Sequence, residues 1–339
     1  MSLSRRIETE IYINSKNITK NISQYLTSIS VSDALDGETC TAEISLEDRD
    51  RLWISDWFPE RGDVCKISFI KKNWRGGDEI ETFDFDLFEV DEITNSFPPN
   101  VCKIKLNSVA SNSELKSADK SRSWEQVKLS KIGQDISAEC GVEFFFDSEN
   151  DPEIERAEQK NQSNLSFLHN LAKKHGLILR VSEKKLILSD EENLESKDSV
   201  SNFSYGDKEI LSFSGRATLS EIYQSAEVEY SHGAKKEKIS GKFEDKTRGG
   251  GKTLKIKKKV SDQAEADDLA KKSLRDKNKK EIEVRLEVVG DFFYLAGNVL
   301  TLDESFGFYA GNFIIDRADW KIGTGFTCSL NLHKCLTGY

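Results

Sequence analysis

The chain has 339 residues, with 49 Lys and Arg against 59 Asp and Glu, so its formal net charge is −10. This net charge argues against a protein that mainly binds nucleic-acid phosphates, because such binding depends on clustered Lys and Arg. The length predicts two or three domains with sizeable cores, and the 37% of hydrophobic residues predicts a folded chain with much wetted surface.

The sequence carries no targeting or membrane signal. Residues 1–13 contain two arginines and then alternate charge with isoleucine, unlike the continuous apolar run of a signal peptide. The charge-free apolar stretch 306–315 is about half the roughly 20 residues that a membrane-spanning helix needs. We therefore expect a protein made and folded in the cytoplasm, without membrane insertion.

The first hundred or so residues alternate apolar and polar side chains with a period of two. This pattern is typical of antiparallel strands with one solvated face. It covers residues 7–13, 40–46, 64–70, 83–90 and 101–107. We expect these strands to close or fold into a barrel or sandwich.

The pattern then changes to that of helices. Apolar residues at spacings of three and four over 129–140 predict a short amphipathic helix, with Ser130 as its N-cap and Gly141 as its terminator. An apolar strand at 141–146 follows.

A second helix is predicted from residue 164 to 175, with a stripe formed by Leu165, Leu168, Leu171 and Ala172. Ser163 or Asn164 can cap its start, and Gly176 can take the left-handed stop. Two short strands with a turn around Glu183 complete a compact α+β domain that ends near Ser199.

The remainder returns to strands, at 282–289, 298–302, 311–320 and 326–335, with one helix at about 261–276. Ser261 is the candidate cap of that helix, and its narrow apolar stripe is enough to lie on a sheet. The fold class is thus mainly β with an α+β insert. The expected domains are a β-barrel-like domain over 1–109, a small α+β domain over 110–199 and a second β-barrel-like domain over 200–339.

The six cysteines are dilute and lie mostly inside alternating apolar patterns, as where Cys65 shares a face with Ile67 and Phe69. We interpret them as buried free thiols in strands rather than a disulfide framework. No CxxC pair occurs, and His333 with Cys335 has no second pair to complete four ligands, so no metal site is predicted.

One short motif, GGGKT at 249–253, looks like the end of a phosphate-binding loop. That loop needs a glycine where this chain has Lys246, and the residues that follow alternate like a strand. We expect a basic loop at the tip of a hairpin. An alternative is that its cations contact an acidic partner or passing DNA; the candidate contacts are Lys246, Arg248, Lys252 and Lys255.

Candidates for catalysis are few. His169 and His175 are six residues apart, about 240° around one helix, so they cannot share a substrate. His232 lies in a turn and His333 in the last strand. The acid-rich runs at 147–158 and 190–198 are interpreted as solvated polar loops rather than a paired-carboxylate cleft, and the tryptophans as packing anchors. No catalytic or cofactor-binding residue is predicted.

Four stretches together resemble the late control protein D family, the baseplate hub proteins of contractile-tail phages. The first two stretches are FPERGDVCKISF with the segment through SVAS, and KSRSWEQVKLSKIGQDISAECGV. The third is EQKNQSNLSFLHNLAKKHGLILRVSEKKLIL, which departs from the family where Asn164 replaces an acid. The fourth runs from residue 260 to 332. The matching positions are Gly62, Val64, Phe88, Val90, Asp91, Glu92, Pro98, Pro99, Gln159, Asn161, Ser163, Phe167, Leu168, Leu171, Ala172, Gly176, Gly290 and Gly297.

The resemblance implies two barrel-like domains, similar to each other, around a smaller helical domain. It also implies a homotrimer whose six barrels form a pseudo-sixfold ring that joins a sixfold tail tube to a threefold central spike. The resemblance implies the tube protein, the spike protein and the tape-measure protein as partners, with DNA only as cargo that passes through. It also implies that the protein is part of the virion baseplate, which is assembled in the bacterial cytoplasm. Because the sequence stops soon after the last family-like strand, the spike is expected to be a separate polypeptide.

Two alternatives stay open. One is the equivalent hub of a phage-derived injection machine, such as a tailocin or a secretion-system spike complex. The other is a tail-associated cell-wall hydrolase, which would need a cleft with paired acids or a Cys and His dyad. If the chain lines a conduit, its net charge predicts acids along the channel or its mouths, with residues 252–259 as a basic exception that faces a partner.

Overall fold

The computed structural model describes residues 4–60, 62–74, 79–109, 115–116, 119–149, 151–182, 185–218, 220–231, 238–260 and 262–339. Strands predominate in this part of the chain, which confirms a mainly β fold with a smaller α+β part. Among the described helices, none combines the length and the apolar character needed to span a bilayer.

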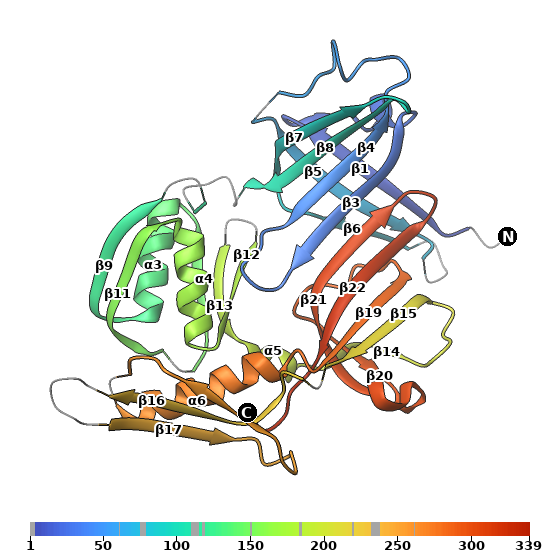
Figure 1. Cartoon of the computed structure of the whole chain (residues 1–339). Helices are drawn as coiled ribbons and strands as arrows, with labels where there is room; N and C mark the ends of the chain where they lie inside the picture. Colours follow the sequence, from blue (N-terminus) through green and yellow to red (C-terminus); the bar gives the residue numbers. More distant parts are fainter. Residues whose placement is uncertain are drawn as a thin grey trace.

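The first β unit is built from the N-terminal strands, drawn in blue and teal in Figure 1. It contains β1 (Arg6–Ile13), β2 (Lys16–Asn17), α1 (Thr19–Ile22), β3 (Leu26–Ala34), β4 (Thr41–Glu47), β5 (Val64–Lys72), β6 (Ile80–Asp84), β7 (Phe88–Ser96) and β8 (Val101–Ser108). The strands follow one another in the order β3-β4-β8-β7-β5-β1-β2, and β6 pairs with β5. Alternate residues such as Ile11, Ile29, Ile44, Ile67 and Ile104 point into its core, as the period of two predicts.

The second β unit is built from the last part of the chain. It contains β14 (Ser199–Phe203), β15 (Ile210–Ala217), β19 (Ile282–Val289), β20 (Val299–Leu302), the 3-10 helix η1 (Glu304–Tyr309), β21 (Gly311–Ile322) and β22 (Phe326–Lys334). The strands run in the order β15-β19-β22-β21, and β20 connects β14 to β21.

The two β units are joined by main-chain pairing into one 14-stranded sheet. Strand β21 runs antiparallel to β3, with Arg317 opposite Ala34 and Ile322 opposite Ile29. Side chains from both units, including Phe69, Phe85, Trp320 and Phe326, belong to one continuous hydrophobic core. The sheet therefore passes from one unit to the other without a break.

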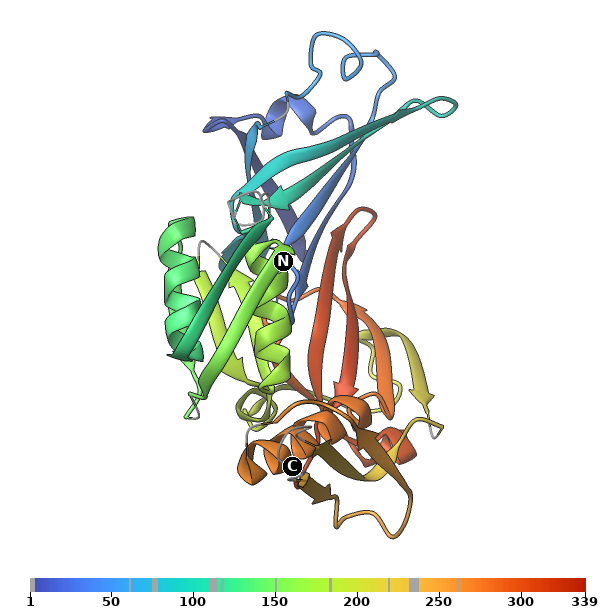
Figure 2. The same cartoon turned by 60° about the vertical axis from the view of Figure 1, so that its left-hand side comes forward.

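The α+β domain lies beside this sheet and has a core of its own (Figure 2). It contains β9 (Lys120–Lys128), α3 (Leu129–Cys140), β10 (Glu143–Asp147), β11 (Glu153–Gln162), α4 (Asn164–Lys174), β12 (Leu177–Ser182), β13 (Lys185–Asp190) and α5 (Glu191–Glu195). The strands form a three-stranded sheet, β10-β13-β12, and a two-stranded sheet, β11-β9.

Helix ends in this domain test the capping predictions. Ser163 caps α4 by accepting a hydrogen bond from Ser166 N, and Gly141 and Gly176 take positive φ values of 66° and 70°, so these predictions are confirmed. Ser130 as the cap of α3 is wrong. It lies inside the helix, where its N–H donates to Asp151 Oδ1 at 3.0 Å, because a carboxylate from the segment before β11 reaches the free N–H groups first.

A third small unit is formed by the strands between β15 and β19. It contains β16 (Tyr223–Ser231), β17 (Lys238–Glu244), β18 (Lys252–Ile256) and α6 (Gln263–Asn278), which covers one face of the sheet. The apolar stripe of α6 thus packs on this sheet, and Ala266, Ala270 and Leu274 are buried there in a separate core. The cap of α6 is Asp262, which accepts from Glu265 N at 2.8 Å; the predicted cap, Ser261, lies outside the described residues.

Candidate functional site

The boundary between the two β units contains a buried ion pair. The Lys71 side chain on β5 is 1% exposed, and its Nζ lies 2.5 Å from Asp291 Oδ1 and 2.8 Å from a Glu81 carboxylate oxygen. The same ammonium stands 4.3 Å from the centre of the Phe292 ring, and Trp320 Nε1 donates to the main-chain oxygen of Asp291 at 3.0 Å. Lys71 and Glu81 come from the first unit and the other three from the second, so these contacts hold the units in one orientation.

The α+β domain is attached where the two β units meet. Arg180 on β12 donates to Asp33 Oδ2 on β3 and to the main-chain oxygen of Ala296, both at 3.0 Å. Burial raises the pKa of Asp33, and the Arg180 guanidinium and the Ala296 N–H oppose that rise. One arginine therefore connects all three parts.

A buried charge cluster connects the second β unit to α5 and α6. His333 on β22 lies with Nδ1 2.7 Å from Asp316 on β21 and Nε2 3.3 Å from Glu195 on α5. Arg275 on α6 contacts Glu195 at 2.7 Å, and Lys279 contacts Glu191 at 2.9 Å. Burial lowers the pKa of His333, but the Asp316, Glu195 and Glu191 carboxylates outweigh it and raise that pKa to about 9.

This charge cluster is the group that sequence reasoning missed. The acids at 190–198 were predicted to be solvated, which is wrong for Glu191 and Glu195, because both are buried. Together with His333 they offer three ligand atoms within 4.8 Å of one another, but Arg275 and Lys279 already neutralise the two carboxylates. No short sequence pattern predicts this charge cluster, because its members come from elements that are far apart in the sequence.

The histidines, acidic runs and cysteines considered in the sequence analysis lie in the following places. His169 Nε2 lies 3.2 Å from Asp36 between the domains, and burial lowers the pKa of His175 to about 4. His232 lies outside the described residues. The acids at 153–158 stand on strand β11 rather than in a loop, so that prediction is also wrong. All six cysteines are free thiols, as predicted, and Cys65, Cys102 and Cys328 are buried on strands. The prediction of buried strand positions is wrong for Cys40, Cys140 and Cys335, which are half-buried, with Cys140 on helix α3.

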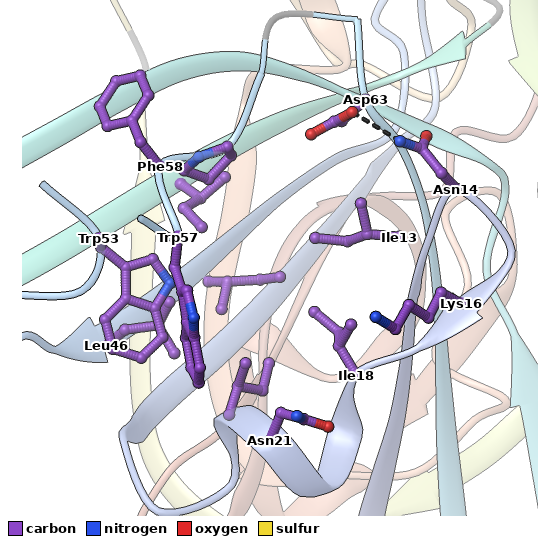
Figure 3. A pocket seen from close by; sticks show the side chains of 14 residues that line it. Ile13, Asn14, Lys16, Ile18, Asn21, Leu46, Trp53, Trp57, Phe58 and Asp63 are labelled. Atoms are coloured by element: carbon purple, nitrogen blue, oxygen red, sulfur yellow. Dashed lines mark hydrogen bonds between the residues drawn. The ribbon is translucent and has the colours of Figure 1, made fainter. Parts of the chain in front are cut away.

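An open apolar pocket of about 520 Å³ lies at the free end of the first β unit (Figure 3). Its walls come from β1, β2, α1, β4 and the segment between β4 and β5. The lining residues are Ile13, Asn14, Lys16, Ile18, Asn21, Ile22, Ile44, Leu46, Trp53, Trp57, Phe58, Pro59, Asp63 and Ile104. Trp53 is buried and packs edge to face on Trp57 with ring centroids 5.5 Å apart, whereas Trp57 and Phe58 remain 40% and 52% exposed.

Two polar groups at this pocket behave differently. Asp63 accepts a hydrogen bond from Asn14 Nδ2 at 2.7 Å, so its carboxylate is engaged. Lys16 directs its ammonium toward the hollow (Figure 3), and among the described residues it has no acidic partner. The pocket thus offers apolar surface and the Lys16 ammonium, which has no acidic partner among the described residues.

The positions that resemble the late control protein D family lie at turns and in cores. Phe88 and Val90 are buried on β7, Asp91 is exposed on the same strand, and Pro98 and Pro99 form the exposed turn between β7 and β8. On α4, Phe167 and Leu168 are buried and Leu171 is half-buried; Gly176 follows that helix. Gly290 has the Phe326 ring where a Cβ would stand, and Gly297 has a φ of 87°.

The basic loop is not a hairpin tip. Because β17 and β18 lie on opposite sides of β16, the segment 245–251 crosses over the end of that sheet, and the hairpin prediction is wrong. Arg248 is held within the chain by Asp245 at 2.9 Å and by Glu281. Lys252 donates to the main-chain oxygen of Ser220 at 3.0 Å, while Lys246 and Lys255 are exposed.

No protein-family model matches the sequence, and no curated protein matches it significantly. Several solved structures match this chain, and their fold is that of tail proteins. The 43 kDa tail protein of prophage MuSo2 from Shewanella oneidensis matches with a TM-score of 0.76 and 14% identity, over 97% of this chain and 99% of that one.

Two further structures match over almost the whole chain. The tail protein from Neisseria meningitidis MC58 has a TM-score of 0.73 and 11% identity, with 97% of this chain and 96% of that one covered. The Escherichia coli c3393 protein, a component of the type VI secretion system with structural similarity to T4 bacteriophage tail proteins gp27 and gp5, has a TM-score of 0.59 and 9% identity, over 99% of this chain and 79% of that one.

Proposed function

We propose that this protein is a structural baseplate hub of a contractile phage tail. In this proposal three copies form a ring that joins the sixfold tail tube to the threefold central spike, and the protein acts without catalysis. Residues 1–109 and 200–339 supply the two barrels of each copy, and residues 110–199 the domain between them. The ring lies in the virion baseplate after assembly in the host cytoplasm, and DNA passes through it only as cargo.

The observation that carries the proposal is the joined sheet. Two β units in one chain share a continuous core and a strand pair, so they keep a fixed orientation that each copy repeats. Two similar units per chain let three chains present six contacts to a tube, and a head-to-tail interface that closes gives a ring. The likeness to tail proteins over nearly the whole chain supports the same assignment.

A second candidate is the hub of a phage-derived injection machine. The observation that favours it is the match to the type VI secretion component over 99% of this chain. The two candidates differ in their tube and spike partners, so co-purification with the tube and spike proteins of each kind of machine separates them.

The test is the mass of the purified protein, alone and with a co-expressed spike protein, followed by electron microscopy. The hub assignment expects three copies of the 38.4 kDa chain, arranged in a threefold ring with a pseudo-sixfold outline. A persistent monomer under both conditions contradicts it. Clearing of peptidoglycan by the isolated protein would instead favour the cell-wall hydrolase.

A further inference from the structure

The second β unit carries an exposed aromatic projection at its far end. Tyr205 and Phe308 are 69% and 63% exposed, although both are large aromatic side chains. Tyr205 N donates to Ser305 Oγ at 2.7 Å, and its ring packs edge to face on the buried Phe306, so the two segments form one rigid projection. Aromatic side chains are enriched at the binding hot spots of protein interfaces, and contiguous exposed apolar patches mark such sites.

The projection is acidic, and neither of its carboxylates forms an ion pair among the described residues. Asp303 caps η1 and Glu304 is its first residue, and no Lys or Arg occurs from 303 to 309. Hydrogen bonds from the Ser204 and Ser305 hydroxyls lower the pKa of Asp303 and keep it ionised. Across the described residues, Glu304 forms no ion pair.

The pocket of the first β unit has the opposite character. Apolar and aromatic side chains line it, and Lys16 points into it without an acidic partner among the described residues. Lys20, on the adjoining helix α1, is likewise exposed and forms no ion pair within the described chain. An aromatic group flanked by carboxylates therefore complements this pocket in apolar character and in charge.

The two surfaces cannot meet within one copy. The pocket lies at the end of the first β unit where the segment between β4 and β5 loops out, whereas η1 follows β20 at the opposite end of the joined sheet (Figures 1 and 2). A second copy placed head to tail brings the projection of one chain to the pocket of the next. Such a heterologous contact closes into a ring when its rotation allows.

We propose that the Tyr205 and Phe308 projection of one copy seats in the pocket formed by Lys16, Ile18, Trp53, Trp57 and Phe58 of the neighbouring copy, with Asp303 and Glu304 facing Lys16 and Lys20. This inference rests on the proposed ring and names the contact that closes it. Burying the rings removes exposed aromatic surface at both ends of the sheet, and the ion pairs fix their register.

The first experiment is zero-length carbodiimide crosslinking of the purified wild-type protein, followed by mass spectrometry. Crosslinked peptides that join Lys16 or Lys20 to Asp303 or Glu304 are expected in the trimer fraction. Because the two surfaces lie at opposite ends of the chain, such a crosslink must connect two copies. A trimer that yields other crosslinks but none of these overturns the inference.

The second experiment measures the trimer's dissociation concentration in variants. Phe308→Asp is expected to raise it at least about tenfold, and Phe145→Asp, at an exposed aromatic on β10 of the α+β domain, to leave it unchanged. Glu304→Lys is expected to weaken the trimer and Lys16→Glu, added to it, to restore part of the loss. Unchanged circular dichroism confirms that each variant folds.

The outcomes separate this contact from the hub assignment. A wild-type trimer that persists unchanged in Phe308→Asp and Glu304→Lys overturns the contact and leaves the hub standing. An equal loss in Phe145→Asp also overturns it. A wild type that stays monomeric alone and with the spike overturns the hub, and the contact with it.

Discussion

The two main joints of this molecule are held by different forces. The joint between the β units consists of main-chain hydrogen bonds from β3 to β21 and a continuous apolar core. The joint between the second β unit and helices α5 and α6 is a buried cluster of charges around His333. Apolar burial and main-chain pairing are insensitive to pH near neutrality, whereas a histidine cluster titrates, so only the second joint is adjustable.

Carboxylates outnumber the other cations around His333. Glu191, Glu195 and Asp316 supply three negative charges, and Arg275 and Lys279 supply two positive ones. The imidazolium provides the third positive charge, which is why its pKa is raised to about 9. In the first joint, the contacts of Lys71 with Asp291 and Glu81 involve no histidine.

The largest expected effect comes from breaking the apolar joint at its centre. Trp320→Ala removes a side chain that is 1% exposed and contacts Phe83 and Phe85 of the first unit. We expect the free energy of unfolding in urea to fall by about 4 kcal/mol. Trp57→Ala is the matched control, because that ring is partly exposed, and it should cost less than about 1 kcal/mol. Equal losses in the two variants would contradict a joint that depends on apolar burial.

A smaller effect is expected from the buried ion pair at the same joint. Lys71→Met keeps the apolar stem but leaves the Asp291 carboxylate without its counter-charge, which should cost about 3 kcal/mol in urea unfolding. The control is Arg216→Met, because the Arg216 and Glu283 pair is exposed and should contribute less than about 0.5 kcal/mol. If Lys71→Met were neutral, the pair would be dispensable for this joint.

The smallest effect is the pH dependence of the charged joint. The folded pKa of His333, about 9, lies above the ordinary value of 6.5, so its stabilisation is complete below pH 6.5 and is lost as the pH rises through about 9. We expect the free energy of unfolding to fall by about 2 kcal/mol between pH 6.5 and 9.5, with faster amide exchange in α5 and α6.

His333→Gln should remove the His333 share of that fall, about 2 kcal/mol. A smaller fall above about pH 8 should remain, because burial raises the pKa of thiols such as Cys65 and Cys102 and the unfolded chain loses those protons first. His175→Gln is the matched control, because burial lowers the pKa of His175 to about 4 and this group stays neutral across the range. A fall as large in His333→Gln as in the wild type would place the titrating group elsewhere. A slope lost in His175→Gln would contradict the assignment in the same way.

Local structure could largely be predicted from the sequence. The period of two identified strands such as β4, β5 and β8, and helical spacing identified α3 and α4 with the Ser163 cap. These features depend on neighbouring residues alone. The prediction of the α3 cap failed because the acceptor at this helix end, Asp151, comes from a segment beyond the helix. Only the tertiary fold brings Asp151 to the helix N-terminus.

Features that depend on distant partners were not predictable. Nothing in the β3 sequence indicates that β21 will pair with it. The sequence likewise does not indicate that β16 lies between β17 and β18, which makes their connection a crossover. Glu191 and Glu195 look like solvated acids until Arg275, Lys279 and His333 are brought to them. The pocket likewise depends on the segment 53–59 folding back over β4.

The pairing of β3 with β21 also constrains how the chain is made. Ser32 and Asp319, hydrogen-bonded neighbours across this pair, are 287 residues apart in the sequence. During synthesis, β3 leaves the ribosome long before β21 exists, so the first β unit carries an unpaired strand edge until almost the whole chain has emerged. An open edge is a template for mispairing with other nascent chains. Completion of the sheet is therefore a late, long-range folding step.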